Sequence, residues 1–133
     1  MELSTDERIA QALDARRDLI DITTTGRTTG LPRRIEIVFH NFGGRFYISG
    51  MPKPEKRAWL ANLETDPRLT FHLKRTVTAD LPARARIIDD QAERRTVLAE
   101  IISTAWHDQD LEAMVSRSPL IEVTIDQPVA SAA

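Results

Sequence analysis

The sequence contains no cysteine among its 133 residues. This absence excludes disulfides, thiolate metal sites, iron–sulfur clusters and a cysteine nucleophile. The sequence also lacks any uninterrupted apolar run near the roughly 20 residues that span a bilayer, so we expect no membrane span. The first seven residues carry three acidic and no basic side chains, whereas a secretory signal is basic and then apolar. We therefore expect a cytoplasmic protein.

Motifs that mark common catalytic and cofactor sites are also missing. The chain has no G-x-G-x-x-G, Walker, H-E-x-x-H or G-x-S-x-G pattern. Its histidines, His40, His72 and His107, lie in separate segments without further ligands at metal-binding spacing. We expect no metal site. Aromatic residues make up only 5% of the chain, which argues against a surface that stacks nucleic-acid bases.

The charge is distributed unevenly along what we expect to be a single domain over residues 1–133. The net charge is −2, yet residues 26–57 hold seven basic and two acidic side chains, and the remainder carries −7. A basic segment inside an acidic protein suits a small anionic ligand better than a polyanion, which the surrounding field repels. The alternative is a basic surface that only faces solvent.

Local patterns predict an α+β fold with a mainly antiparallel, barrel-like sheet of about six strands and three flanking helices. Ser4 and Glu7 have the spacing of a capping box at the start of a helix over residues 4–17, within an N-terminal segment 1–18. Glycine and proline place a turn at 26–32. The predicted strands are 19–24, 33–40, 45–50, 69–75, 77–88 and 118–125. The other predicted helices are 55–65 and 90–106, the second with a capping box from Asp90 and Glu93, and we expect a frayed tail at 127–133.

Residues 33–40 and 45–50 form a predicted hairpin with one apolar and one polar face. The apolar face supplies much of the expected core, together with one residue of the strand 69–75 and two of the last helix: Ile35, Ile37, Phe39, Phe46, Ile48, Phe71, Ile101 and Ile102. The polar face carries Arg34, Glu36, His40, Tyr47 and Ser49. It is either the solvent-facing side of the sheet or a functional surface.

Two turns have the composition of anion sites. The first, residues 21–34, combines a glycine turn, hydroxyls and the three guanidinium groups of Arg27, Arg33 and Arg34. Strand alternation allows only one of Arg33 and Arg34 to face a ligand, and it favours Arg34. The second is residues 49–54, which lead into the helix expected from Glu55. Lys53, Lys56 and Arg57 add positive charge there.

These residues resemble a known family. The run Thr23-Thr24-Thr25-Gly26-Arg27-Thr28-Thr29-Gly30, followed by Pro32-Arg33-Arg34, is similar to the signature loop of the deazaflavin-dependent nitroreductases and quinone reductases. The later series Gly44-Arg45-Phe46-Tyr47, Ser49-Gly50, Arg57-x-Trp59-x-x-Asn62-Leu63 and Asp66-Pro67 fits the same pattern. The resemblance covers residues 20–73 and extends more loosely to the C-terminus.

The resemblance implies a split β-barrel related to flavin-binding oxidases of the pyridoxamine phosphate oxidase type. It also implies binding of coenzyme F420, a deazaflavin with a phospholactyl and polyglutamate tail. Six first-loop positions would line the anionic tail: Arg27, Thr28, Thr29, Gly30, Arg33 and Arg34. Further positions near the cofactor would be Ser49, Gly50, Lys53, Arg57, Trp59 and Asn62, although Trp59 also suits packing. The second loop, Met51-Pro52-Lys53-Pro54, departs from the glycine-rich loop of many relatives, and Leu60 replaces their tyrosine.

The resemblance implies an oxidoreductase that transfers hydride from the reduced deazaflavin to a small quinone, nitro compound or activated enone. Tyr47 and His40 are weak candidates for a proton donor, because both lie on the predicted polar face. The alternative is a non-catalytic protein of the same fold that binds FMN, FAD, haem or a lipid, and FMN is the alternative cofactor. Analogy with the related oxidases, which pair their barrels, favours a homodimer.

Overall fold

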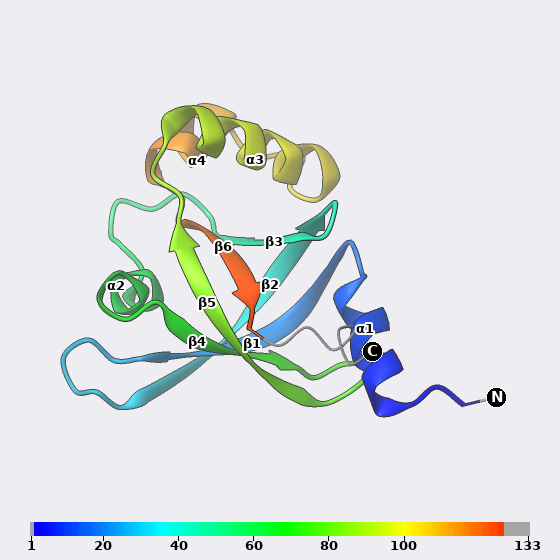
Figure 1. The fold of residues 1–133 in the computed structure, drawn as a ribbon. Coiled ribbons are helices and arrows are strands. Elements are labelled where there is room, and N and C mark those ends of the chain that lie inside the picture. Colours follow the sequence, from blue (N-terminus) through cyan, green and yellow to red (C-terminus); the bar gives the residue numbers. More distant parts are fainter. Residues whose placement is uncertain (1, 127–133) are drawn as a thin grey trace.

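The structure, a computed structural model, describes residues 2–126, so the tail predicted at 127–133 lies outside the described residues. The elements follow in the order α1 (Thr5–Leu13), β1 (Arg17–Thr25), β2 (Pro32–Phe42), β3 (Arg45–Ser49), α2 (Ala58–Thr65), β4 (Arg68–Leu73), β5 (Ala79–Ile87), α3 (Gln91–Thr104), α4 (Leu111–Arg117) and β6 (Leu120–Ile125). The strands close into a barrel in the order β1-β2-β3-β6-β5-β4 (Figure 1). Every neighbouring pair is antiparallel. The predicted fold class is confirmed.

Short-range signals fix the first elements. The Ser4 hydroxyl accepts from the Glu7 backbone N–H, and the Glu7 carboxylate accepts from the Ser4 N–H, which confirms the capping box. The helix ends at Leu13, earlier than predicted, because Arg17 already begins β1 opposite His40 of β2. At the β2–β3 turn, Gly43 and Gly44 have φ angles of 65° and 89°. Glycine adopts such positive φ angles without the steric penalty that side chains cause.

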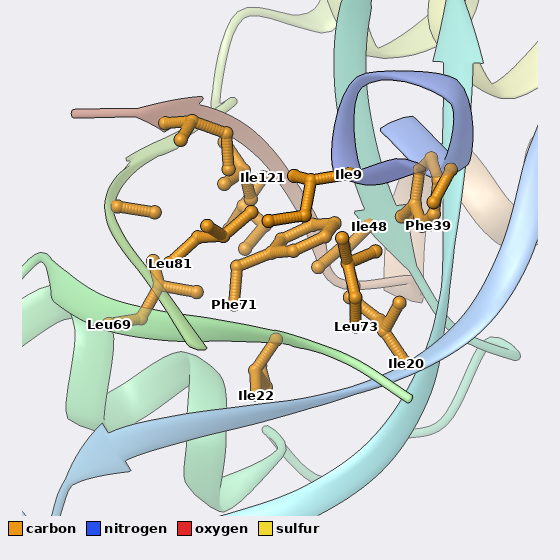
Figure 2. Packing of buried hydrophobic residues seen from close by; sticks show 14 of the residues in the cluster. Ile9, Ile20, Ile22, Phe39, Ile48, Leu69, Phe71, Leu73, Leu81 and Ile121 are labelled. Carbon is orange, nitrogen blue, oxygen red and sulfur yellow. The ribbon is translucent and has the colours of Figure 1, made fainter. Parts of the chain in front are cut away.

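The barrel interior holds the main core. Phe39, Ile48 and Phe71 are fully buried and meet side chains from every strand (Figure 2). Ile9 of α1 joins the same cluster, so this helix covers one end of the barrel. The predicted core positions Ile35, Ile37 and Phe46 pack against this cluster but are only partly buried.

A second apolar layer lies outside the barrel. Helices α3 and α4 pack against β3 and the start of β6 (Figure 1), and the cluster there includes Tyr47, Leu98, Ile101, Met114 and Leu120. The sequence did not indicate α4, which is a short helix of seven residues. Ile102 packs against the cluster but is only partly buried.

Because of this layer, the polar face of the hairpin does not face solvent at His40, Tyr47 and Ser49. His40, Tyr47 and Ser49 are only 1%, 5% and 3% exposed. Alternation along a strand shows which residues share a face, but it does not show whether another element covers that face. Arg34 and Glu36, further along β2, remain exposed.

Two predicted helix starts change in detail. Helix α2 begins at Ala58, so Lys53, Lys56 and Glu55 precede it and Arg57 is its N-cap residue. Helix α3 begins after Asp90, whose carboxylate caps the Glu93 N–H. The second half of that predicted capping box is wrong, because the Glu93 carboxylate binds Arg86 instead. Among residues 2–126, no helix is long and apolar enough to cross a bilayer.

Candidate functional site

The first basic loop and α2 enclose a cavity of about 490 Å³. The loop joins β1 to β2 and lies beside α2 (Figure 1). Seven of the predicted cofactor-binding residues line this cavity: Arg27, Thr28, Thr29, Arg33, Arg34, Trp59 and Asn62. Trp59 is only 8% exposed and belongs to the barrel core as well, so it combines packing with a place in the cavity wall.

Backbone hydrogen bonds shape this loop. The Gly26 N–H donates to the Leu31 carbonyl at 2.8 Å, and the Gly30 N–H donates to the Gly26 carbonyl at 2.7 Å. Gly30 has a φ of 73°, which side chains rarely adopt. A Cβ on Gly26 would lie 2.9 Å from the Thr29 hydroxyl oxygen. Both glycines are therefore needed for the shape of the loop. Gly30 itself lines the neighbouring cavity at Thr70 and Pro82.

Asn62 connects α2 to the first loop. Its Oδ1 accepts from the Arg27 backbone N–H at 3.0 Å, and its Nδ2 donates to the Thr24 hydroxyl at 3.0 Å. The side chain is 4% exposed. The resemblance pointed to Asn62 as a cofactor contact and missed this positioning role. A polar residue on the otherwise apolar side of α2 is the sequence signal for it.

The three guanidinium groups of the first loop differ in their partners. Arg34 Nε lies 2.9 Å from Asp21 Oδ2, whereas Arg27 and Arg33 have no ion pair within residues 2–126. Lys74 also binds Asp21, and these two cations lower the pKa of the Asp21 carboxyl. The freely available positive charge in this cavity therefore comes from Arg27 and Arg33.

The remaining predicted cofactor residues lie elsewhere. Lys53 and Arg57 line a second cavity of about 360 Å³, at the start of α2 and beside the α4–β6 connection. Ser49 is buried, and its hydroxyl donates to the Pro119 carbonyl at 2.6 Å. A Cβ on Gly50 would lie 2.9 Å from Arg57 Nη2, so the guanidinium group packs directly on that glycine. The predicted set is therefore dispersed: seven residues line the first cavity and two the second, Gly30 lines a third, and Ser49 and Gly50 line none of these three.

The two proton-donor candidates line neither cavity. His40 packs edge-on against Trp106 with 5.2 Å between ring centroids, and burial lowers its pKa from 6.5 to about 4. Burial also raises the pKa of Tyr47. The structure thus places both side chains beneath α3 and α4, away from the basic loop.

The fold and the basic cavity define the class first: a split-barrel protein with a basic glycine loop beside a cavity. A family model described as F420H(2)-dependent quinone reductase matches residues 3–128. The chain belongs to this family and is an oxidoreductase whose cofactor is coenzyme F420. The cavity fits the anionic part of that group, since it offers two arginines without ion pairs, threonine hydroxyls and a glycine loop.

Solved structures share the fold at low sequence identity. Rv2991, a conserved hypothetical protein from Mycobacterium tuberculosis, has a TM-score of 0.63 and 17% identity, over 96% of this chain and 83% of that one. The haem storage protein HutZ from Vibrio cholerae has a TM-score of 0.67 and 13% identity, over 94% and 92%. An FAD-binding protein from Mesorhizobium loti has a TM-score of 0.60 and 15% identity, over 94% and 91%. These similarities concern the fold alone.

Proposed function

We propose that this protein uses the reduced deazaflavin to reduce a small electrophile: a quinone, a nitro compound or an activated enone. The observation that carries the proposal is the pair of arginines, Arg27 and Arg33, which have no ion pair with any residue of 2–126 and lie in a cavity whose loop is held by Asn62. Phosphate and carboxylate groups bind such guanidinium forks with charge-assisted hydrogen bonds. This is the complement that the phospholactyl and polyglutamate tail requires.

The residues of this chain bind and orient, and the bound deazaflavin supplies the hydride. Arg27, Arg33 and the hydroxyls of Thr28 and Thr29 hold the anionic tail. Gly30 keeps the shape of the loop through its positive φ, and Arg34 contributes less because Asp21 already neutralises it. Tyr47 and His40 have no part in this proposal, since neither lines a cavity beside the basic loop.

A spectroscopic titration followed by turnover tests the proposal. We expect the purified protein to bind coenzyme F420 and to oxidise its reduced form when menadione or a nitroaromatic compound is added. FMN serves as the matched control and should bind more weakly. Tight binding of FMN or haem without any turnover of reduced F420 would support the non-catalytic alternative and overturn this proposal. Sedimentation of the same sample measures its mass and shows whether it forms the homodimer that the analogy favours.

A further inference from the structure

The second cavity contains two unsatisfied polar groups. Within residues 2–126, only three buried side-chain nitrogen or oxygen atoms have no hydrogen-bond partner: His40 Nε2, Arg57 Nη1 and Ser118 Oγ. Arg57 and Ser118 line the same cavity, whereas His40 does not. A buried polar group without a partner is unfavourable, especially when it is charged. Two such groups beside one cavity make it a candidate site for a polar ligand.

Both groups can donate hydrogen bonds to an oxyanion. Arg57 carries a fork of N–H donors, and the Ser118 hydroxyl supplies another. Ser118 is 5% exposed. Arg57 is the N-cap residue of α2, and the first turn of that helix has no side-chain cap. Helix N-termini add positive potential for an anion.

The position of Arg57 is fixed before any ligand arrives. Its guanidinium group lies on Gly50, where a Cβ would come within 2.9 Å of Nη2 and 3.3 Å of Pro119 Cγ. Ser49 ties the same strand end to the Pro119 carbonyl at 2.6 Å. Desolvation lowers the pKa of Arg57. It has no carboxylate within 4.0 Å in the described part of the chain.

Two of the other cations that line the cavity already have partners. Arg94 donates to four backbone carbonyls, which belong to Ile88, Met114, Val115 and Ser118. It therefore builds the cavity wall and has few donors left for a ligand. Lys56 binds Glu64. Glu55 and Asp89 also line the cavity and repel anions. Lys53 and Arg117 line it too, and neither has an ion pair within residues 2–126. An anion is therefore favoured where it contacts Arg57 directly, with these two cations nearby.

We propose that this cavity binds a carboxylate or phosphate group through Arg57 and Ser118, at a site separate from the first basic loop. Helix α2 divides the two cavities, because Trp59 and Asn62 line the first whereas Arg57 and Leu60 line the second. The anion is either part of the acidic cofactor tail or an acidic group on the electron acceptor. The assignment of the anion to the cofactor tail or to the acceptor rests on the proposed function, whereas the binding of an oxyanion does not.

Phosphate binding to the full chain without cofactor tests the site. We expect inorganic phosphate to shift the NMR signals of the Arg57 Nε–H and the Ser118 amide in a saturable way. Arg57→Met should weaken phosphate binding at least about tenfold, and Ser118→Ala by a smaller factor. Arg33→Gln, in the other cavity, is the matched control and should leave these shifts unchanged. Unperturbed Arg57 and Ser118 signals in the wild-type protein would overturn the proposal, whatever happens to the folding of the variants.

A second arm distinguishes the two sources of the anion. If the cofactor tail supplies it, Arg57→Met should weaken the binding of coenzyme F420. If the acceptor supplies it, Arg57→Met should raise the KM for a carboxylated naphthoquinone and leave the KM for its neutral analogue unchanged. Either result supports the site and names its ligand. A failure of the proposed function shows itself separately, as absent turnover while phosphate still binds.

Discussion

Asn62 Oδ1 accepts a hydrogen bond from the backbone N–H of Arg27, 35 positions earlier in the chain, at 3.0 Å. Through this bond α2 sets the position of the first basic loop. The Nδ2 of the same amide donates a hydrogen bond to the Thr24 hydroxyl. Removing the amide would leave the Arg27 N–H and the buried Thr24 hydroxyl without this partner. The shape of the candidate cofactor site therefore depends on a helix that packs beside it.

Replacing this amide should affect both stability and binding. Asn62→Ala should lower the free energy of unfolding by about 1–3 kcal/mol, because it leaves the Arg27 N–H and the Thr24 hydroxyl unpaired. It should also weaken cofactor binding, which calorimetric titration measures. Thr24→Val is the matched control, since it removes one hydrogen bond but keeps the bond to Arg27. Cofactor affinity that is the same in Asn62→Ala and wild type would contradict the positioning role.

The two adjacent arginines of β2 should differ in their contribution to cofactor binding. Arg33→Ala should weaken it by about 1.5–3 kcal/mol, the usual strength of a hydrogen bond to a charged group. Arg34→Ala should weaken it less, because Arg34 is already paired with Asp21. This order reverses the one that strand alternation suggests. Arg33→Lys should recover part of the loss, since an ammonium group cannot bind as a fork. Unchanged cofactor affinity in both alanine variants, with intact folding, would rule out an anion site at this loop.

His40 should make stability depend on pH. Its pKa is lowered from 6.5 to about 4 in the folded protein, so the unfolded chain binds the proton first as the pH falls. The free energy of unfolding should therefore decrease by about 3 kcal/mol between pH 6.5 and pH 4. Urea unfolding across this range measures the effect. His40→Leu should abolish most of it, and an equally steep dependence in that variant would assign the effect to other groups.

Neighbouring arginines on α3 offer a test of how the helical layer is held. Arg94→Met should destabilise the protein by at least about 3 kcal/mol, because four buried carbonyls lose their donor. Arg95→Met removes a similar side chain, whose partner is the exposed Glu112, and should change stability by less than about 0.5 kcal/mol. Chemical denaturation of both variants measures the difference. Equal losses would show that the carbonyl contacts of Arg94 contribute little.

Two isoleucines test the assignment of the barrel interior. Ile48 is fully buried, so Ile48→Ala should lower the free energy of unfolding by about 2–5 kcal/mol. Ile37 belongs to the predicted core but is only partly buried. The loss in Ile37→Ala should therefore be clearly smaller. The reverse order in denaturant unfolding would mean that Ile37 is packed more completely than Ile48.

The sequence determined features that depend on neighbours a few positions apart. Ser4 and Glu7 specify a helix start at short range, and Gly43-Gly44 specifies a tight turn because only glycine adopts those angles easily. Alternation of apolar residues indicated which side of β2 enters the core. The clustered arginines of the first loop indicated an anion site before any contact was known. All of these signals are local, so the order of residues along the chain reveals them.

Tertiary structure decided everything that depends on contacts between distant segments. Helices α3 and α4 bury His40 and Tyr47, and no periodicity in β2 or β3 reveals that cover. Asp21, from the neighbouring strand, binds Arg34 and leaves Arg33 as the freer cation. Ser118 comes to the same cavity as Arg57 only because β6 pairs with β3. Such residues lie 13 or more positions apart, and only strand pairing and helix packing bring them together.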